Sequence, residues 1–120
     1  MAGVILAVDD SASMRQMVNF TLTGAGYEVV QAVDGLEALE YARLHNVDLV
    51  LTDVNMPRMD GITLVKELRA LPSYRYTPML VLTTESSQDR KLQGKQAGAT
   101  GWIVKPFSPD QLLAPIARVL

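Results

Sequence analysis

The stretch "VILAVDDSAS" (residues 4–13) joins a run of five apolar residues directly to two aspartates. A short apolar run rich in β-branched residues is typical of a strand buried on both faces. Asp9 and Asp10 then stand side by side at the carboxyl end of this strand, although like charges repel each other. A helix cap or a turn would account for one aspartate, whereas a bound cation would account for both.

The same alternation of apolar runs and helical patterns continues along the whole chain. Four further strands are predicted, at residues 27–32, 48–52, 79–82 and 102–104. Because parallel neighbours need crossover connections, the alternation predicts an α/β fold, a single-domain, doubly wound (βα)5 structure with a parallel five-stranded sheet over residues 1–120. Sheets of this kind place their functional sites at the carboxyl ends of the strands.

Some segments depart from an ideal pattern. Residues 87–99 contain Leu92 as their one large apolar residue, so we expect a weakly packed helix. Residues 34–37 (DGLE) predict a capping box at the start of another helix. Pro115 is expected to kink the last helix, and Tyr74 is expected at the surface of a loop.

Composition restricts the possible functions. The 120 residues are 48% hydrophobic and 20% charged, as in globular domains, and carry a net charge of −2. No run of Lys or Arg is present, so nucleic acid is not an expected partner. The chain has no cysteine, which excludes disulfides and thiolate metal sites. The amino terminus lacks a basic region and Asp9 interrupts its apolar run, so we expect a cytoplasmic protein without a membrane span.

Asp53 directly follows the predicted strand 48–52. Because the carboxyl ends of parallel strands meet at one edge of a sheet, Asp53 is expected close to Asp9 and Asp10. Three carboxylates in a small space are costly unless a cation is bound. Mg²⁺ suits a few carboxylate oxygens together with water and phosphate, and the sequence therefore predicts a magnesium site.

Two further residues are expected at the same edge. Lys105 follows the strand 102–104, and Thr83 follows the strand 79–82. Each has an ordinary explanation, a solvated surface lysine and a turn hydroxyl. Beside three acids, however, a lysine and a hydroxyl favour a phosphoryl site with an aspartate nucleophile. No Walker-type glycine-rich loop is present, so ATP binding is not implied.

Four motifs in this order resemble the receiver domain of two-component response regulators, and in particular the stand-alone chemotaxis receivers of the CheY type. They are "VDDS" (8–11), "LTDVNMPRMDG" (51–61), "LTTE" (82–85) and "GWIVKPF" (101–107). The resemblance covers the chain from the first strand to the last helix. It implies a flavodoxin-like strand order, 2-1-3-4-5, which periodicity alone does not provide.

The resemblance also implies roles for individual residues. Asp53 would be the phosphoacceptor and would bind Mg²⁺ with Asp10, with the backbone carbonyl of Asn55, and with Asp9 through water. Lys105 would pair with the phosphoryl group.

Other positions would control switching and lifetime. The Thr83 hydroxyl would move toward the phosphoryl group while Trp102 rotates inward, and Asn55 and Glu85 would tune how fast water removes the group. Most family members have Tyr or Phe where this chain has Trp102.

By the same resemblance the chain would be a monomer that takes its phosphoryl group from a sensor histidine kinase of the CheA type. It would then bind a partner such as a flagellar motor switch protein or a phosphatase. It would not be an enzyme beyond phosphorylating itself from a donor and hydrolysing its own phosphoryl group. A phosphate sink, a non-chemotaxis regulator, an inactive scaffold and an aspartate-nucleophile phosphatase remain alternatives. The phosphatase is disfavoured because Asn55 stands where such enzymes have a second aspartate.

Overall fold

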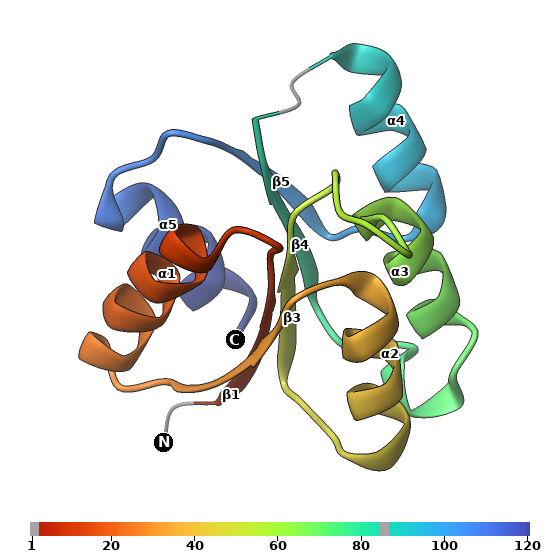
Figure 1. Ribbon diagram of the computed structural model, residues 1–120, viewed down its shortest axis with the longest axis horizontal. Helices are drawn as coiled ribbons and strands as arrows, with labels where there is room; N and C mark the ends of the chain where they lie inside the picture. Colours follow the sequence, from red (N-terminus) through yellow and green to blue (C-terminus); the bar gives the residue numbers. More distant parts are fainter. Residues whose placement is uncertain (1–2, 85–86) are drawn as a thin grey trace.

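The computed structural model describes residues 3–84 and 87–120, which form a parallel sheet between two layers of helices (Figure 1). The sheet has five strands in the order β2-β1-β3-β4-β5, and this confirms the predicted α/β architecture and strand order. The elements in chain order are β1 (Val4–Val8), α1 (Ala12–Gly24), β2 (Glu28–Ala32), α2 (Gly35–Leu44), β3 (Leu49–Thr52), α3 (Gly61–Arg69), the 3-10 turn η1 (Pro72–Tyr74), β4 (Met79–Thr83), α4 (Gln88–Ala97), β5 (Gly101–Val104) and α5 (Pro109–Val119).

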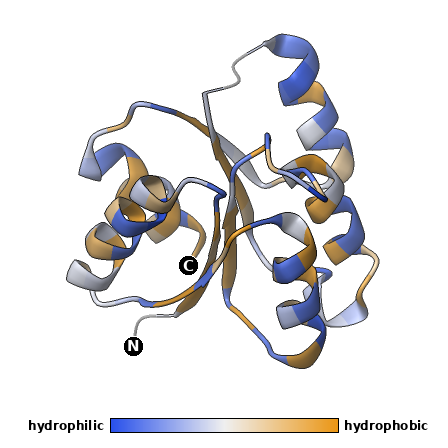
Figure 2. Ribbon diagram, in the orientation of Figure 1, coloured by the Kyte–Doolittle hydropathy of each residue, from blue (hydrophilic) through white to orange (hydrophobic). Residues whose placement is uncertain are grey.

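The core has two parts because alternate residues of each strand face opposite sides of the sheet. On β1, Ile5 and Ala7 pack in the cluster under α1 and α5, while Leu6 and Val8 pack in the cluster under α2 and α3. With both faces covered, the inner strands are apolar except for Thr52 and Thr83 at the ends of β3 and β4, and Figure 2 shows a hydrophobic centre between the helices.

Helix α4 contributes little to the core. Leu92 leaves 54% of its surface exposed, and Gly94 is the buried residue of this helix. The carboxyl end of α4 is nevertheless held by Arg69 of α3, whose guanidinium donates hydrogen bonds of 3.0 and 2.9 Å to the carbonyl oxygen of Gly98. Apart from this contact at its carboxyl end, α4 is weakly packed, as predicted.

Two local predictions need correction. Tyr74 is fully buried in η1, where its hydroxyl donates to the carbonyl oxygen of His45, so the expectation of a surface loop was wrong. The capping box at Asp34 is only half formed, because the Glu37 carboxylate accepts from the backbone N–H of Val33 instead of that of Asp34. The burial of Tyr74 could not be predicted, because this residue lies just after Pro72 and belongs to no periodic pattern of apolar residues.

Helix α5 runs without a break through Pro115. No helix in the described part of the chain is both long and apolar enough to cross a membrane.

Candidate functional site

The register of the central strands brings the acidic residues together. Val8 of β1 lies opposite Thr52 of β3, and the backbone N–H of Asp53 donates to the carbonyl oxygen of Val8 at 2.9 Å. The two strands therefore end at the same level. Carboxylate oxygens of Asp9, Asp10 and Asp53 lie within 4.8 Å of one another, as the sequence predicted.

These carboxylates differ in their exposure and in their partners. Asp9 is buried, Asp53 is half-buried and Asp10 is exposed. The ammonium group of Lys105 lies 2.8 Å from Asp9 Oδ2 and 3.3 Å from Asp53 Oδ2. One ammonium offsets one of three negative charges. The cluster thus keeps an excess of negative charge and offers hard oxygen donors, which are what Mg²⁺ prefers.

Backbone groups fix the orientation of the two inner carboxylates. Asp53 Oδ1 accepts from the N–H of Val54 at 2.7 Å, and Asp9 Oδ1 accepts from the N–H of Ser11 at 2.9 Å. The second oxygen of each carboxylate faces Lys105. Both side chains are therefore held in place by the protein itself, and such positioning lowers the entropic cost of binding or reaction.

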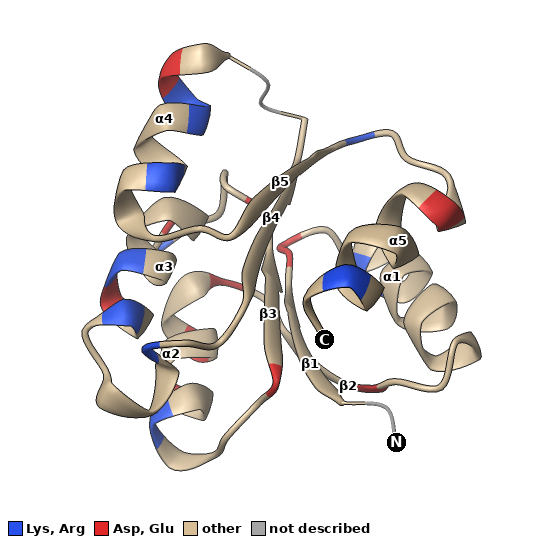
Figure 3. Ribbon diagram, turned by 180° about the vertical axis from the view of Figure 1, so that it is seen from behind, with Lys and Arg blue, Asp and Glu red and all other residues tan. Residues whose placement is uncertain are grey.

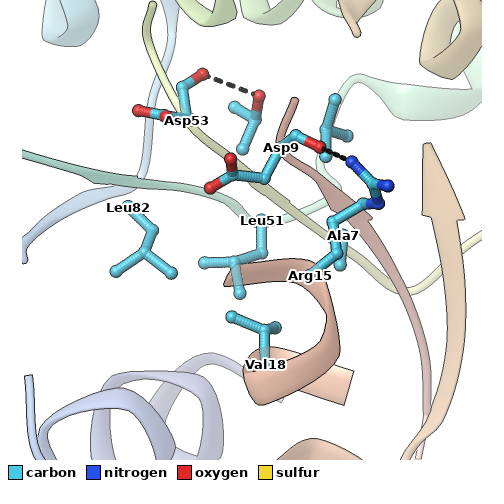
Figure 4. Close-up of a pocket in the computed structure, with 9 residues that line it drawn as sticks. Ala7, Asp9, Arg15, Val18, Leu51, Asp53 and Leu82 are labelled. Carbon is cyan, nitrogen blue, oxygen red and sulfur yellow. Dashed lines mark hydrogen bonds between the residues drawn. The ribbon is translucent and has the colours of Figure 1, made fainter. Parts of the chain in front are cut away.

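Arg15 and Thr52 hold the backbone of the same two aspartates, Asp9 and Asp53. The guanidinium of Arg15 donates to the backbone carbonyl of Asp9, and the hydroxyl of Thr52 donates to the carbonyl oxygen of Asp53 at 2.9 Å (Figure 4). Sequence reasoning did not identify Arg15. A signal existed, because Arg15 is a basic residue near the amino terminus of α1, where the helix dipole disfavours positive charge unless an acceptor is present.

The predicted switch residues occupy neighbouring strands. Thr83 is fully buried at the end of β4, and its carbonyl oxygen accepts from the N–H of Lys105 at 2.9 Å. Trp102 lies on β5 opposite Val81 and is half-buried. A Cβ atom added to Gly94 would lie 2.8 Å from the Trp102 ring, so the indole packs against α4 where the helix has no side chain.

The remaining predicted site residues are the two expected to tune the lifetime. Asn55 is exposed in the loop between β3 and α3. Glu85 lies outside the described residues.

A small cavity lies under the acidic cluster, between α1 and the sheet. Asp9, Asp53 and Arg15 line one side, and Val18, Leu51 and Leu82 line the other (Figure 4). Its volume of about 10 Å³ is enough for roughly one water molecule. This cavity cannot enclose an organic substrate, so a reaction partner would reach Asp53 from the surface.

The comparisons with known proteins agree with this geometry. The model of the response regulator receiver domain family matches residues 5–117. The chain belongs to the response regulator receiver domain family. This confirms the resemblance drawn from the four motifs.

The relatives of this receiver domain include chemotaxis proteins. The chemotaxis protein CheY of Bacillus subtilis is 40% identical over 121 residues, which cover 100% of this chain and 99% of that protein. The solved structure of CheY4 of Vibrio cholerae superimposes with a TM-score of 0.95, at 52% identity and with 100% of both chains covered. A receiver domain of a Pseudomonas aeruginosa sensor histidine kinase, solved with a magnesium ion in its active site cleft, has a TM-score of 0.91 at 29% identity, covering 98% of this chain and 97% of that one.

Proposed function

We propose that Asp53 of this receiver domain accepts a phosphoryl group in a Mg²⁺-dependent reaction and that the phosphorylated chain binds a partner in the control of chemotaxis. The observation that carries this proposal is the convergence of three carboxylates and one ammonium group at the carboxyl edge of the sheet. Receiver domains of the CheY kind take their phosphoryl group from a histidine kinase and are not classical enzymes.

The chemistry requires little beyond positioning. A carboxylate oxygen of Asp53 forms a bond to phosphorus while the bond between phosphorus and the histidine nitrogen of the donor breaks, and the electron pair of that bond returns to the imidazole. Lys105, which now pairs with Asp9 and Asp53, would pair with the new phosphoryl oxygens. Attack of water on phosphorus later releases phosphate and restores the Asp53 carboxylate.

The residues present fit a magnesium ion. Three carboxylates supply hard oxygen donors within 4.8 Å, and the magnesium-bound receiver domain from Pseudomonas aeruginosa supports the assignment by its likeness. Asp10, Asp53 and the backbone carbonyl of Asn55 would hold the ion, with Asp9 acting through water. When bound, Mg²⁺ neutralises charge on the phosphoryl oxygens during transfer.

Switching would pass from Thr83 to Trp102. The Thr83 hydroxyl would move to the phosphoryl group, and the space it leaves would admit the indole. Trp102 also lines a groove of about 240 Å³ between α4 and β5, together with Lys91 and Lys95. Rotation of the indole would therefore reshape this basic groove, and Figure 3 shows basic residues recurring along α4. The surface formed by α4, β5 and α5 would be the output face, to which the partner binds.

A Thr83→Ala variant should separate phosphorylation from switching. We expect it to accept the phosphoryl group but to show less than half of the change in Trp102 fluorescence that phosphorylation causes in the native chain. Trp102 is the sole tryptophan, so its emission reports on this position alone. Thr84→Ala, at the exposed neighbouring residue, is the matched control. An unaltered fluorescence change in Thr83→Ala would exclude Thr83 from the switch.

Transfer from a protein donor tests the proposed function against its enzymatic alternative. Incubated with a radiolabelled, autophosphorylated histidine kinase of the CheA type, the native chain should acquire label, and the matched Asp53→Asn variant should acquire none. Catalytic turnover of p-nitrophenyl phosphate without stable labelling would instead identify an aspartate-nucleophile phosphatase. Binding measurements then test the motor switch and phosphatase partners and the monomeric state. Measurements of the lifetime of the phosphoryl group test the tuning by Asn55 and Glu85. Together they decide between this function and the alternative roles of phosphate sink or non-chemotaxis regulator.

A further inference from the structure

The loop between β3 and α3, residues 54–60, has an unusual backbone at Arg58. This residue has φ of 68°, which places it in the left-handed region that side chains other than glycine rarely adopt. Asn and Asp tolerate this conformation better than arginine does. A contact that stabilises arginine here is therefore expected.

That contact is an ion pair with the start of α2. Arg58 Nε donates to Asp34 Oδ2 at 2.7 Å, and only 6% of the Asp34 side chain is exposed, against 55% for Arg58. The other oxygen of Asp34 accepts from the N–H of Glu37 at 2.9 Å. The hydrogen bond from Arg58, followed by the one from Glu37, holds the pKa of Asp34 below its ordinary value. Asp34 thus binds Arg58 as a charged carboxylate.

The backbone adds a second link between the loop and α2. The N–H of Gly35 donates to the carbonyl oxygen of Met59 at 3.2 Å. A Cβ atom at Gly35 would lie 2.6 Å from that oxygen, so the approach depends on glycine. We call these contacts, formed by Asp34, Gly35, Arg58 and Met59, the α2 clasp.

The base of the loop is closed by the N–H of Gly61, which donates to the carbonyl oxygen of Val54 at 2.8 Å. Within the tip, the N–H of Met59 donates to the carbonyl oxygen of Pro57, also at 2.8 Å. The segment that contains Asn55 is therefore closed at its base and held at its tip by the α2 clasp.

We propose that Asp34 and Arg58 are positioning residues that fix the conformation of residues 54–60 and thereby place Asn55 beside the acidic cluster. This inference rests on the proposed function for its link to Mg²⁺. The pair does not touch the reacting atoms. Its effect reaches the site through the loop backbone, so it sets the affinity for Mg²⁺ without supplying a ligand.

Three variants separate the effects of the ion pair, of the N-cap of α2 and of the left-handed backbone at residue 58. Asp34→Ser keeps an N-cap hydroxyl but removes the charge. Arg58→Ala removes the ion pair and still disfavours the left-handed backbone, whereas Arg58→Asn removes the ion pair but tolerates that backbone. Arg43→Ala, at an exposed arginine of α2, is the matched control.

Calorimetric titration with Mg²⁺ and hydrogen exchange of residues 54–60 provide the test. We expect Asp34→Ser and Arg58→Ala each to weaken Mg²⁺ binding by about tenfold, the lower end of the range for losing a group that orients a metal ligand. Exchange of the loop should become faster in both, even without Mg²⁺. The Mg²⁺ affinity and the exchange rate of Arg58→Asn should lie between those of these variants and those of the native chain. The double variant should bind Mg²⁺ no more weakly, and exchange no faster, than either single variant.

The outcomes distinguish this inference from the proposed function. If the native chain does not bind Mg²⁺, the proposed function and the positioning role both fail, while the exchange rates still decide whether the α2 clasp holds the loop. If the native chain binds Mg²⁺ but Asp34→Ser and Arg58→Ala bind it equally well, only the positioning role is overturned. Arg58 is exposed, so its variants are expected to fold.

Discussion

Replacing Lys105 by methionine is expected to lower the free energy of unfolding by about 3 kcal/mol in the absence of Mg²⁺. Lys105 has 9% of its side chain exposed and pairs with both inner carboxylates. Methionine keeps most of the apolar length but removes the charge, and the three acids then repel one another without compensation. Saturating Mg²⁺ should restore part of the loss, because the cation neutralises the same carboxylates. Urea denaturation with and without Mg²⁺ measures both effects.

Lys66→Met is the control for this experiment, since Lys66 is an exposed residue of α3. A surface substitution of this kind should change the free energy of unfolding by no more than about 0.5 kcal/mol, with the same value in the presence of Mg²⁺. If Lys105→Met were as stable as the native chain without Mg²⁺, the acidic cluster would not depend on its lysine, and the electrostatic description of the site would be wrong.

Gly61→Ala is expected to damage both the fold and the site. A Cβ atom at Gly61 would lie 1.8 Å from the carbonyl oxygen of Asp53 and 3.1 Å from the Cα of Val54. Both neighbours are backbone, so the clash is relieved only by moving α3 or Asp53, the proposed phosphoacceptor. We expect the free energy of unfolding to fall by about 3 kcal/mol and the rate of phosphorylation of Asp53 to fall with it.

Gly24→Ala provides a matched comparison, because a Cβ atom at Gly24 would meet no atom within 4 Å. Alanine there should raise the free energy of unfolding by about 0.5 kcal/mol through the smaller entropy of the unfolded chain. Urea denaturation of the two variants checks the contrast. Equal stability of Gly61→Ala and Gly24→Ala would show that the approach of α3 to Asp53 is not as close as described.

Much of the site could be predicted from sequence because it depends on topology. Asp9, Asp53 and Lys105 each directly follow a predicted strand, and parallel strands bring such positions to one edge. The strand order itself came from the resemblance, since periodicity does not define which strands are neighbours. The weak packing of α4 was also visible, because one large apolar residue cannot form a buried stripe.

Other features could not be predicted because they depend on three-dimensional contacts between irregular segments. The partner of Arg58 is Asp34, which lies 24 residues away at the start of another helix. The hydroxyl of Tyr74 donates to the carbonyl oxygen of His45, and both residues lie in segments without a periodic sequence pattern. The packing of Trp102 against Gly94 requires the position of α4 relative to β5, and a glycine inside a helix gives no indication of which ring it accommodates.

The acidic cluster and helix α4 differ in how firmly the rest of the structure holds them. The central strands β1 and β3 end beside each other and hold the acidic cluster at the carboxyl edge of the sheet, where chemistry needs fixed geometry. Helix α4 lies beside Trp102 and buries few apolar side chains, so moving it costs little free energy. A well-anchored site beside a weakly packed helix is the arrangement that the proposed phosphorylation switch requires.

The central claim is most directly tested by the intact mass of the chain after incubation with acetyl phosphate, with and without Mg²⁺, beside the Asp53→Asn variant. The account predicts one phosphoryl adduct that forms on the native chain with Mg²⁺ and is absent when either Mg²⁺ or Asp53 is removed. A folded native chain that acquires no adduct, or an adduct that persists in Asp53→Asn, would contradict it.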